Sequence, residues 1–250
     1  MEFETSKQFD KLGSSMSRFK ILIISIFLLI SILTSAKNTR ILIVTGGHDF
    51  DREAFFQMFD SFDEISYQEL KHPQANLQLG QIDPKTFDAV VFYDMPKTIS
   101  EAEKESYHRL LNLGKGLLFL HHSLCSYQDW DEYKLIVGGK YHEEQNSPQS
   151  STYRHDVTFP VMIKDPANPI TKGISDFNIL DEVYGNTEVL PDVKVLLTTN
   201  HPESSAVIGW THKMGRSRIV YIQLGHDKNS YSNPTYRQIV RQAIHFVSKH

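Results

Sequence analysis

The chain has 250 residues, with 26 basic and 30 acidic side chains, 40% hydrophobic residues and 11% aromatic residues. This composition is typical of a globular protein with a full core, and the length suits one large domain or two small ones. The mildly acidic balance and the lack of a basic patch argue against nucleic acid or anionic lipid as a partner.

The first predicted element is a secretory signal peptide within residues 1–36. Two basic residues precede an uninterrupted apolar run over 21–33, and small residues follow up to Ala36. The run is shorter than the roughly 20 residues of a membrane span. We therefore expect cleavage after Ala36, no stable membrane insertion afterwards and a periplasmic location. An uncleaved N-terminal anchor is the alternative, and Met16 is a second candidate start.

The predicted mature chain remains mildly acidic and has one cysteine. Removal of residues 1–36 takes away four of the 26 basic and three of the 30 acidic residues, which leaves a formal charge of −5. Because Cys125 is the single cysteine, no disulfide can form within the exported chain. Cys125 is therefore a buried thiol or a reactive one, and we favour the buried thiol.

The first half of the mature chain alternates strands and helices. Strands are predicted over 40–47, 65–70, 87–95 and 117–122, where short apolar or alternating runs end in polar or glycine residues. Phenylalanines at helical spacing follow the first strand. Ser100 with Glu103 forms a capping box for a helix that runs to about Leu113. This alternation predicts right-handed crossovers and a parallel, doubly wound sheet.

The second half predicts an antiparallel extension of that sheet. A short helix over 130–139 and a polar loop over 141–151 come first, and a closing helix begins at about Pro234. Between them lie strand candidates separated by turn signals, over 155–163, 181–186, 193–200, 206–213 and 217–226. No internal repeat or low-complexity linker interrupts residues 37–250, so we expect a single domain.

Several well-known catalytic and nucleotide-binding motifs are missing. The glycines after the first strand read TGGHDFD, which matches neither GxGxxG nor the phosphate-binding GxxxxGK[ST]. The chain also has no GxSxG, CxxC or HExxH motif. These absences argue against a dinucleotide enzyme, a serine hydrolase of the elbow type and the simplest zinc sites.

Polar side chains instead follow the predicted strands at their carboxyl ends. The stretch LLFLHHSLC (Leu117–Cys125) ends an apolar strand with two histidines, and GHD (Gly225–Asp227) ends the last strand. Because the carboxyl ends of parallel strands share one edge of a sheet, these groups are expected to converge there. Neighbours in a strand point to opposite faces, so we expect His121 to face the site and His122 to face away.

Four segments, in one order, resemble the trehalose-utilisation ThuA-like family. They are GxGLLFLHHS, WDEYKLIVGGKYH, PANPITKGISDFNILDEVYGN and IGWTHKMGRSRIVYIQLGHD, and the likeness extends from about Arg40 to His250. The family is similar in architecture to class I glutamine amidotransferases. The resemblance implies a flavodoxin-like fold and a link to sugar metabolism, in which the family's genes accompany dehydrogenases that make 3-keto sugars.

The chain departs from the amidotransferases at the position of their nucleophile. Their elbow presents a cysteine between glycines, whereas this sequence has His121 or His122 at that point and Cys125 beyond the turn. A glutaminase mechanism needs a thiolate activated by histidine. A glutaminase activity is therefore disfavoured.

Site residues are expected in part from the resemblance and in part from the polar and aromatic side chains near the predicted strand ends. We expect acid–base catalysis from His121, Glu182, His226 and Asp227, with Asp227 orienting the ring of His226. Expected sugar-binding residues are His48, Asp49, Trp130, Tyr141 and Tyr184. In the segment DEVY, alternation places Glu182 and Tyr184 on one face.

Two further hypotheses concern cofactor and function. His121, His142 and His226 would be the ligands to test for a divalent transition metal such as zinc. The favoured function is an enzyme that isomerises, cleaves by elimination or hydrolyses a sugar, 3-keto sugar or glycoside. A non-catalytic carbohydrate-binding protein and a metallohydrolase are the alternatives.

Overall fold

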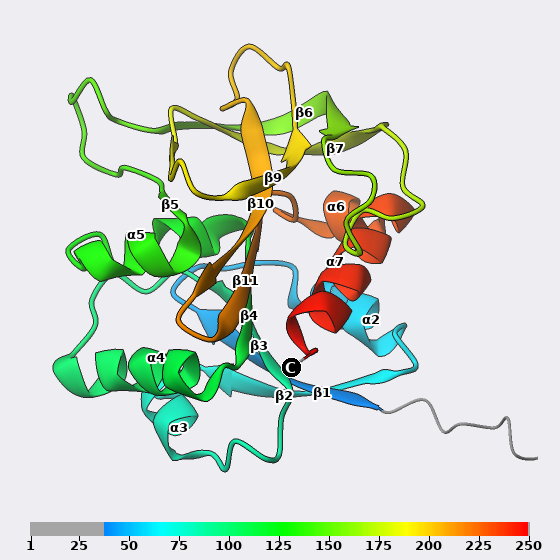
Figure 1. Ribbon diagram of the computed structural model, residues 1–250. Coiled ribbons are helices and arrows are strands. Elements are labelled where there is room, and N and C mark those ends of the chain that lie inside the picture. The colour runs from blue at the N-terminus through cyan, green and yellow to red at the C-terminus, as the bar shows by residue number, and fades with distance from the viewer. Residues whose placement is uncertain (1–37, 250) are drawn as a thin grey trace, which may run out of the picture. The chain divides into compact units, whose positions relative to one another are not determined.

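The computed structural model describes residues 38–249, in which one nine-stranded sheet has the order β2-β1-β3-β4-β11-β10-β9-β6-β7 (Figure 1). Five strands at one end are parallel: β2 (Ile65–Lys71), β1 (Thr39–Gly46), β3 (Ala89–Asp94), β4 (Gly116–Leu120) and β11 (Ser217–Ile222). This order, with β1 between β2 and β3, is that of a flavodoxin-like sheet. The predicted fold class is confirmed.

The other end of the sheet is antiparallel, as predicted. It consists of β10 (Val207–Met214), β9 (Lys194–Thr198), β6 (Thr152–Ile163) and β7 (Phe177–Gly185). A two-stranded ribbon of β5 (Gly139–Lys140) and β8 (Glu188–Val189) lies apart from it. The strands β6 and β7 both begin earlier than the sequence pattern indicated, at Thr152 and Phe177.

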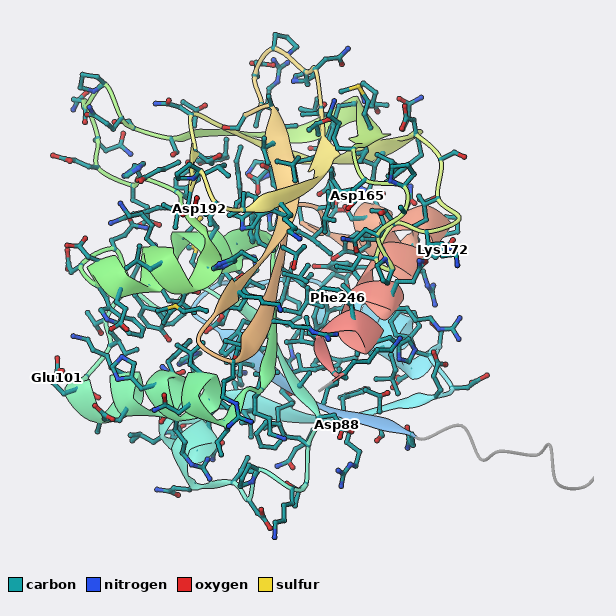
Figure 2. The ribbon with its side chains drawn as sticks, viewed as in Figure 1. Asp88, Glu101, Asp165, Lys172, Asp192 and Phe246 are labelled. Atoms are coloured by element: carbon teal, nitrogen blue, oxygen red, sulfur yellow. The ribbon has the colours of Figure 1, made fainter. Side chains whose placement is uncertain are left out.

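Helices cover both faces of the parallel strands (Figure 1). The helices α2 (Arg52–Asp60), α6 (Lys228–Ser232) and α7 (Pro234–Val247) lie on one face, and α3 (Ala75–Gln81), α4 (Glu101–Leu113) and α5 (Asp131–Val137) lie on the other. Side chains of the strands alternate between the two resulting cores. In β3, Val91 and Tyr93 belong to the first core, and Val90 and Phe92 belong to the second. Figure 2 shows side chains filling the space between the sheet and its helices.

The carboxyl ends of β1, β3, β4 and β11 meet at one edge of the sheet. The last residues of these strands are Gly46, Asp94, Leu120 and Ile222. The chain order reverses between β1 and β3, which is where open α/β sheets place their ligands. The polar segments that follow these strands are therefore brought together.

The signal-peptide prediction concerns residues outside the described range. None of the helices in residues 38–249 is long and apolar enough to cross a bilayer.

Candidate functional site

His121 begins the site because the strand β4 ends one residue before it. The predicted strand over 117–122 stops at Leu120, and a 3₁₀ turn (His121–Cys125) follows. His121 has a φ of +48°, a left-handed conformation that is costly for a residue with a side chain. The hydroxyl of Tyr221 donates to the His121 carbonyl (3.1 Å), and the hydroxyl of Ser123 donates to the Leu120 carbonyl (2.9 Å). These contacts hold the turn.

The ring of His121 joins a cluster of four side chains. Its Nδ1 donates to the main-chain carbonyl of Gln223 (2.6 Å), and its Nε2 lies 2.9 Å from Oε2 of Glu182. The same Nε2 lies 3.2 Å from Nδ1 of His226 and 2.9 Å from the hydroxyl of Tyr184. The structure therefore brings together His121, Glu182, Tyr184 and His226, all of which were predicted site residues.

Asp181 positions two members of this cluster. Its buried carboxylate accepts backbone N–H bonds from Glu182 (2.8 Å), Gly225 (2.8 Å) and His226 (2.9 Å), which ties the segment after β11 to β7. Gly225 has a φ of +114°, and a Cβ there would lie 2.1 Å from the Tyr236 hydroxyl. Because only glycine fits, the chain can turn at Gly225 and place the ring of His226 beside Glu182.

Contacts within the cluster shift the pKa values of Glu182 and His226 in opposite directions. Burial alone would raise the pKa of Glu182, but hydrogen bonds with His121 and His226 outweigh it and hold that pKa well below its usual range. Burial alone would lower the pKa of His226, but its hydrogen bond with Glu182 and the nearby acidic charges raise that pKa above its ordinary value. The site therefore favours an ionised carboxylate.

A pocket with a volume of about 240 Å³ opens onto this cluster. Histidines, acids and tyrosines make up most of its wall: His48, His122, His155, Glu143, Glu182, Tyr141, Tyr153, Tyr184 and His226, with Met95 and Cys125. Among the expected sugar-binding residues, His48, Tyr141 and Tyr184 thus line the pocket. Burial raises the pKa of the Cys125 thiol, which is consistent with a buried, unreactive cysteine.

His122 lies in the pocket wall, contrary to the expectation that it faces away. The alternation rule fails because His122 belongs to the 3₁₀ turn and not to the strand. Its ring packs between His48 (4.7 Å) and Tyr93 (4.3 Å), and neither ring nitrogen has a hydrogen-bond partner among the described residues. Burial and the nearby histidines hold the pKa of His122 well below its usual range. His122 therefore lines the pocket as a buried ring whose lowered pKa favours the neutral form.

His155 is a site residue that the sequence analysis missed. Its Nδ1 lies 3.1 Å from Oε1 of Glu182, and its ring lies 4.6 Å from that of His226. The antiparallel register pairs Tyr153 with Tyr184, so Tyr153 and His155 project toward the site. Alternation of Tyr153 and His155 was the available signal, but the pairing of β6 with β7 could not be predicted from it.

Three predicted site residues have other roles. His142 pairs with Glu188 (3.1 Å) and lines a separate hollow. The predicted metal-ligand set of His121, His142 and His226 is therefore wrong, because His142 does not join the other two. Trp130 packs in the core at 5.8 Å from the ring of Tyr133, so it offers no platform for a sugar. The carboxylate of Asp227 caps α6 by accepting from the Asn229 backbone (2.8 Å) and does not orient the ring of His226.

Asp49 also lies apart from the cluster. It lines a neighbouring hollow with His48, Arg52, Lys71 and His72, and only His48 is shared with the pocket. The predicted contact of Asp49 with a ligand in the pocket is therefore not supported.

Comparisons with known proteins identify the family. The structure defines the general class of the protein: a flavodoxin-like α/β protein with a histidine–carboxylate site at the carboxyl edge of its sheet. The model of the trehalose-utilisation family ThuA matches residues 40–247. The chain belongs to the ThuA family. No match was found among curated proteins.

Solved structures with the same fold include two ThuA-like proteins. The one from Parabacteroides merdae has a TM-score of 0.72 at 14% identity, covering 85% of this chain and 91% of that one. The one from Bacteroides uniformis has a TM-score of 0.64 at 16% identity, covering 86% and 93%. A glutamine amidotransferase from Thermotoga maritima has a TM-score of 0.51 at 11% identity, covering 85% and 99%. The resemblance to amidotransferases is therefore one of fold.

Proposed function

We propose that this protein is an exported enzyme that acts on a sugar, an oxidised 3-keto sugar or its glycoside by proton transfer. Membership of a trehalose-utilisation family supports a sugar as the substrate class. The observation that carries the proposal is the cluster of His121, Glu182 and His226 at the wall of a pocket that also contains neutral histidines. Such a set offers both proton acceptors and proton donors near neutral pH.

The size and chemistry of the pocket favour a small, unphosphorylated sugar. Its volume of about 240 Å³ is below the roughly 300–1,000 Å³ of sites for drug-sized ligands. Among the described residues that line it, none is a lysine or an arginine, so a phosphate group would find no permanent cation there. The rings of Tyr141, Tyr153 and Tyr184 supply apolar surface and hydroxyl groups for a sugar.

The proposed chemistry needs no nucleophile. In a 3-keto glycoside, the carbonyl at C3 acidifies the hydrogen at C2. A base of the site removes that proton, and the electron pair forms a C1–C2 double bond as the C1–O bond breaks. A protonated group then gives its proton to the departing oxygen, so protons and electrons balance. If the C1–O bond stays intact, removal of the C2 proton instead gives an enediol across C2 and C3, with a proton added to the C3 oxygen. Loss of the proton from the C2 hydroxyl and protonation at C3 then give the 2-keto isomer.

The experiment is turnover of 3-keto glucosides beside the unoxidised parent glucosides. Purified protein is incubated in D₂O, and NMR spectroscopy follows deuterium at C2 and release of the aglycone. We expect exchange or cleavage with the keto compound, a loss of at least about 100-fold in Glu182→Gln and little change in His142→Ala. Absence of exchange and cleavage would contradict the proposal. Tight binding of unoxidised sugar without turnover would favour the carbohydrate-binding alternative.

Export is tested separately. If residues 1–36 are removed during secretion, the mature protein recovered from the periplasm should begin at Lys37, as read by N-terminal sequencing. Recovery of the uncleaved chain in the membrane fraction would favour the N-terminal anchor.

A further inference from the structure

We propose that His121, Glu182 and His226 form a binding site for one divalent first-row transition-metal ion. Each residue offers one ligand atom, and these three atoms converge within the described part of the chain. Nε2 of His121 and Oε2 of Glu182 are 2.9 Å apart, Nδ1 of His226 and the same oxygen are 3.1 Å apart, and the two nitrogens are 3.2 Å apart.

The triangle fits one face of a six-coordinate ion. Adjacent ligands that each lie about 2.1 Å from an octahedral ion are about 3.0 Å apart, whereas the separation around a tetrahedral ion is about 3.4 Å. The observed edges of 2.9, 3.1 and 3.2 Å agree with the octahedral value. Two histidines and one carboxylate on a single face leave the opposite coordination positions open.

The protonation of His121 supports a cation at this point. A carbonyl oxygen can only accept, so the contact with Gln223 requires the Nδ1 of His121 to carry its proton. In the neutral ring, Nε2 then presents a lone pair to Glu182 and to His226. A main-chain carbonyl that fixes the tautomer in this way is the usual support of a metal-binding histidine.

A metal ion would also resolve a contact between two acceptors. A proton on His226 satisfies its contact with Glu182, and the hydroxyl of Tyr184, 2.9 Å from Nε2 of His121, can donate to that nitrogen. With Nδ1 of His121 carrying the proton of the neutral ring, the 2.9 Å contact between Nε2 and Oε2 of Glu182 still joins two acceptors. One divalent ion at the centre accepts all three electron pairs at once.

The ligand atoms are held in advance of binding. His121 and Glu182 are buried, and the carboxylate of Asp181 fixes the backbone of both Glu182 and His226 by accepting their N–H groups. Glu182 and His226 also line the pocket, so the open positions are accessible to a small ligand. Precise support of this kind is what metal sites require, because misplaced ligands weaken binding.

For catalysis, the ion would polarise a carbonyl oxygen of the substrate. Proton transfer would then fall to a side chain outside the ligand set, such as His122, which lines the same pocket. This consequence depends on the proposed function, whereas the metal site itself does not, because binding of the ion can be measured without any sugar.

The test measures metal binding directly. The full protein is treated with EDTA, dialysed and titrated with Co²⁺ and Zn²⁺ by calorimetry, and the visible spectrum of the Co²⁺ form is recorded. The variants are His226→Ala, whose side chain is 22% exposed, and Glu182→Gln, which keeps the shape of the side chain. His142→Ala is the matched control, because His142 is also paired with a glutamate but lies outside the cluster.

We expect one equivalent of Co²⁺ with the weak visible bands of a six-coordinate ion. The affinity should fall by at least about 100-fold in His226→Ala and in Glu182→Gln and stay within about threefold of wild type in His142→Ala. Thermal unfolding of each variant without metal shows whether it is folded, and the exposed His226→Ala variant carries the test if Glu182→Gln is unstable. Absence of stoichiometric binding, or equal affinity in His226→Ala and the wild type, would overturn the proposal.

Discussion

Replacement of Asp181 by asparagine should loosen the segment that carries His226. One carboxylate oxygen of Asp181 accepts from the backbone N–H groups of Glu182 and His226, and the other accepts from that of Gly225. Asparagine keeps one oxygen but places an NH₂ group where the second oxygen was. A buried donor would then face the N–H of Gly225, and the two remaining bonds would lose their charged acceptor.

The magnitude follows from these three bonds. One buried N–H without an acceptor costs about 1–3 kcal/mol, and the change from charged to neutral acceptor costs about 1 kcal/mol more. Burial of the carboxylate, which raises the pKa of Asp181, offsets part of this cost. We expect a net destabilisation of about 1.5–3 kcal/mol, or a fall in Tm of about 3–12 °C for a chain of this size.

The assay combines thermal unfolding with amide hydrogen exchange. The Tm should fall, and the amides of Gly225 and His226 should exchange faster than in the wild type. The control is Asp176→Asn, which removes one carboxylate oxygen at an exposed position where Asp176 accepts a single N–H from Ile163. A Tm within about 2 °C of the wild type, with both amides still protected, would refute the positioning role of Asp181.

Three further predictions concern stability and reactivity. Burial alone would raise the pKa of Glu64, but hydrogen bonds from Arg241 and His245 lower it to about 2. The ionised Glu64 should therefore stabilise the folded chain by about 1 kcal/mol above about pH 4.5, and this contribution should be lost as the pH falls toward 2. The Tm difference between wild type and Glu64→Gln should therefore shrink in acid. Because burial raises the pKa of its thiol, Cys125 should react with a disulfide reagent only slowly until the chain is unfolded. Gly47→Ala should destabilise the fold by about 2–3 kcal/mol in urea unfolding, since its φ is +82° and a Cβ would lie 2.5 Å from neighbouring backbone.

Each of these predictions has a matched control or an opposing outcome. Gly173→Ala isolates the backbone cost for Gly47, because Gly173 has a φ of +77° but nothing lies within 4 Å of its added Cβ. Equal losses in the two variants would show that the steric contact does not matter. A Tm difference for Glu64→Gln that is independent of pH would contradict the ion pair. Fast modification of native Cys125 would contradict its burial.

Much of the fold was predictable because it depends on local patterns. The continuous apolar runs of β3 and β4 require burial on both faces, and the alternation of strands with helices requires parallel crossovers. The capping box was also local, and Glu103 does accept from the Ser100 backbone (2.8 Å). The helix α3 was missed because its seven residues, ANLQLGQ, are short and include a glycine.

The site was predictable only in part. His121 and His226 follow the neighbouring parallel strands β4 and β11, so the sheet order brings these two residues together. Glu182 lies on the edge strand β7, which β10, β9 and β6 separate from β11, so its approach to the histidines was not predictable from the strand order. His122 lies in the pocket wall because β4 ends before it, which could not be read from the apolar run. His155 belongs to the site because of the register of β6 against β7. His142, by contrast, pairs with Glu188 of β8 and lies outside the cluster.

The amino-acid sequence by itself determined the sheet type, the strand-end location of the site and the chemical character of its residues. These properties follow from hydrophobic periodicity and from the identity of side chains that directly follow strands. Only the tertiary structure decided which histidines meet one carboxylate, because that choice depends on contacts between segments about sixty to a hundred residues apart, such as His121 with Glu182 and with His226. Local sequence cannot specify such contacts, since a shift of one residue in a turn or strand pairing redirects each side chain.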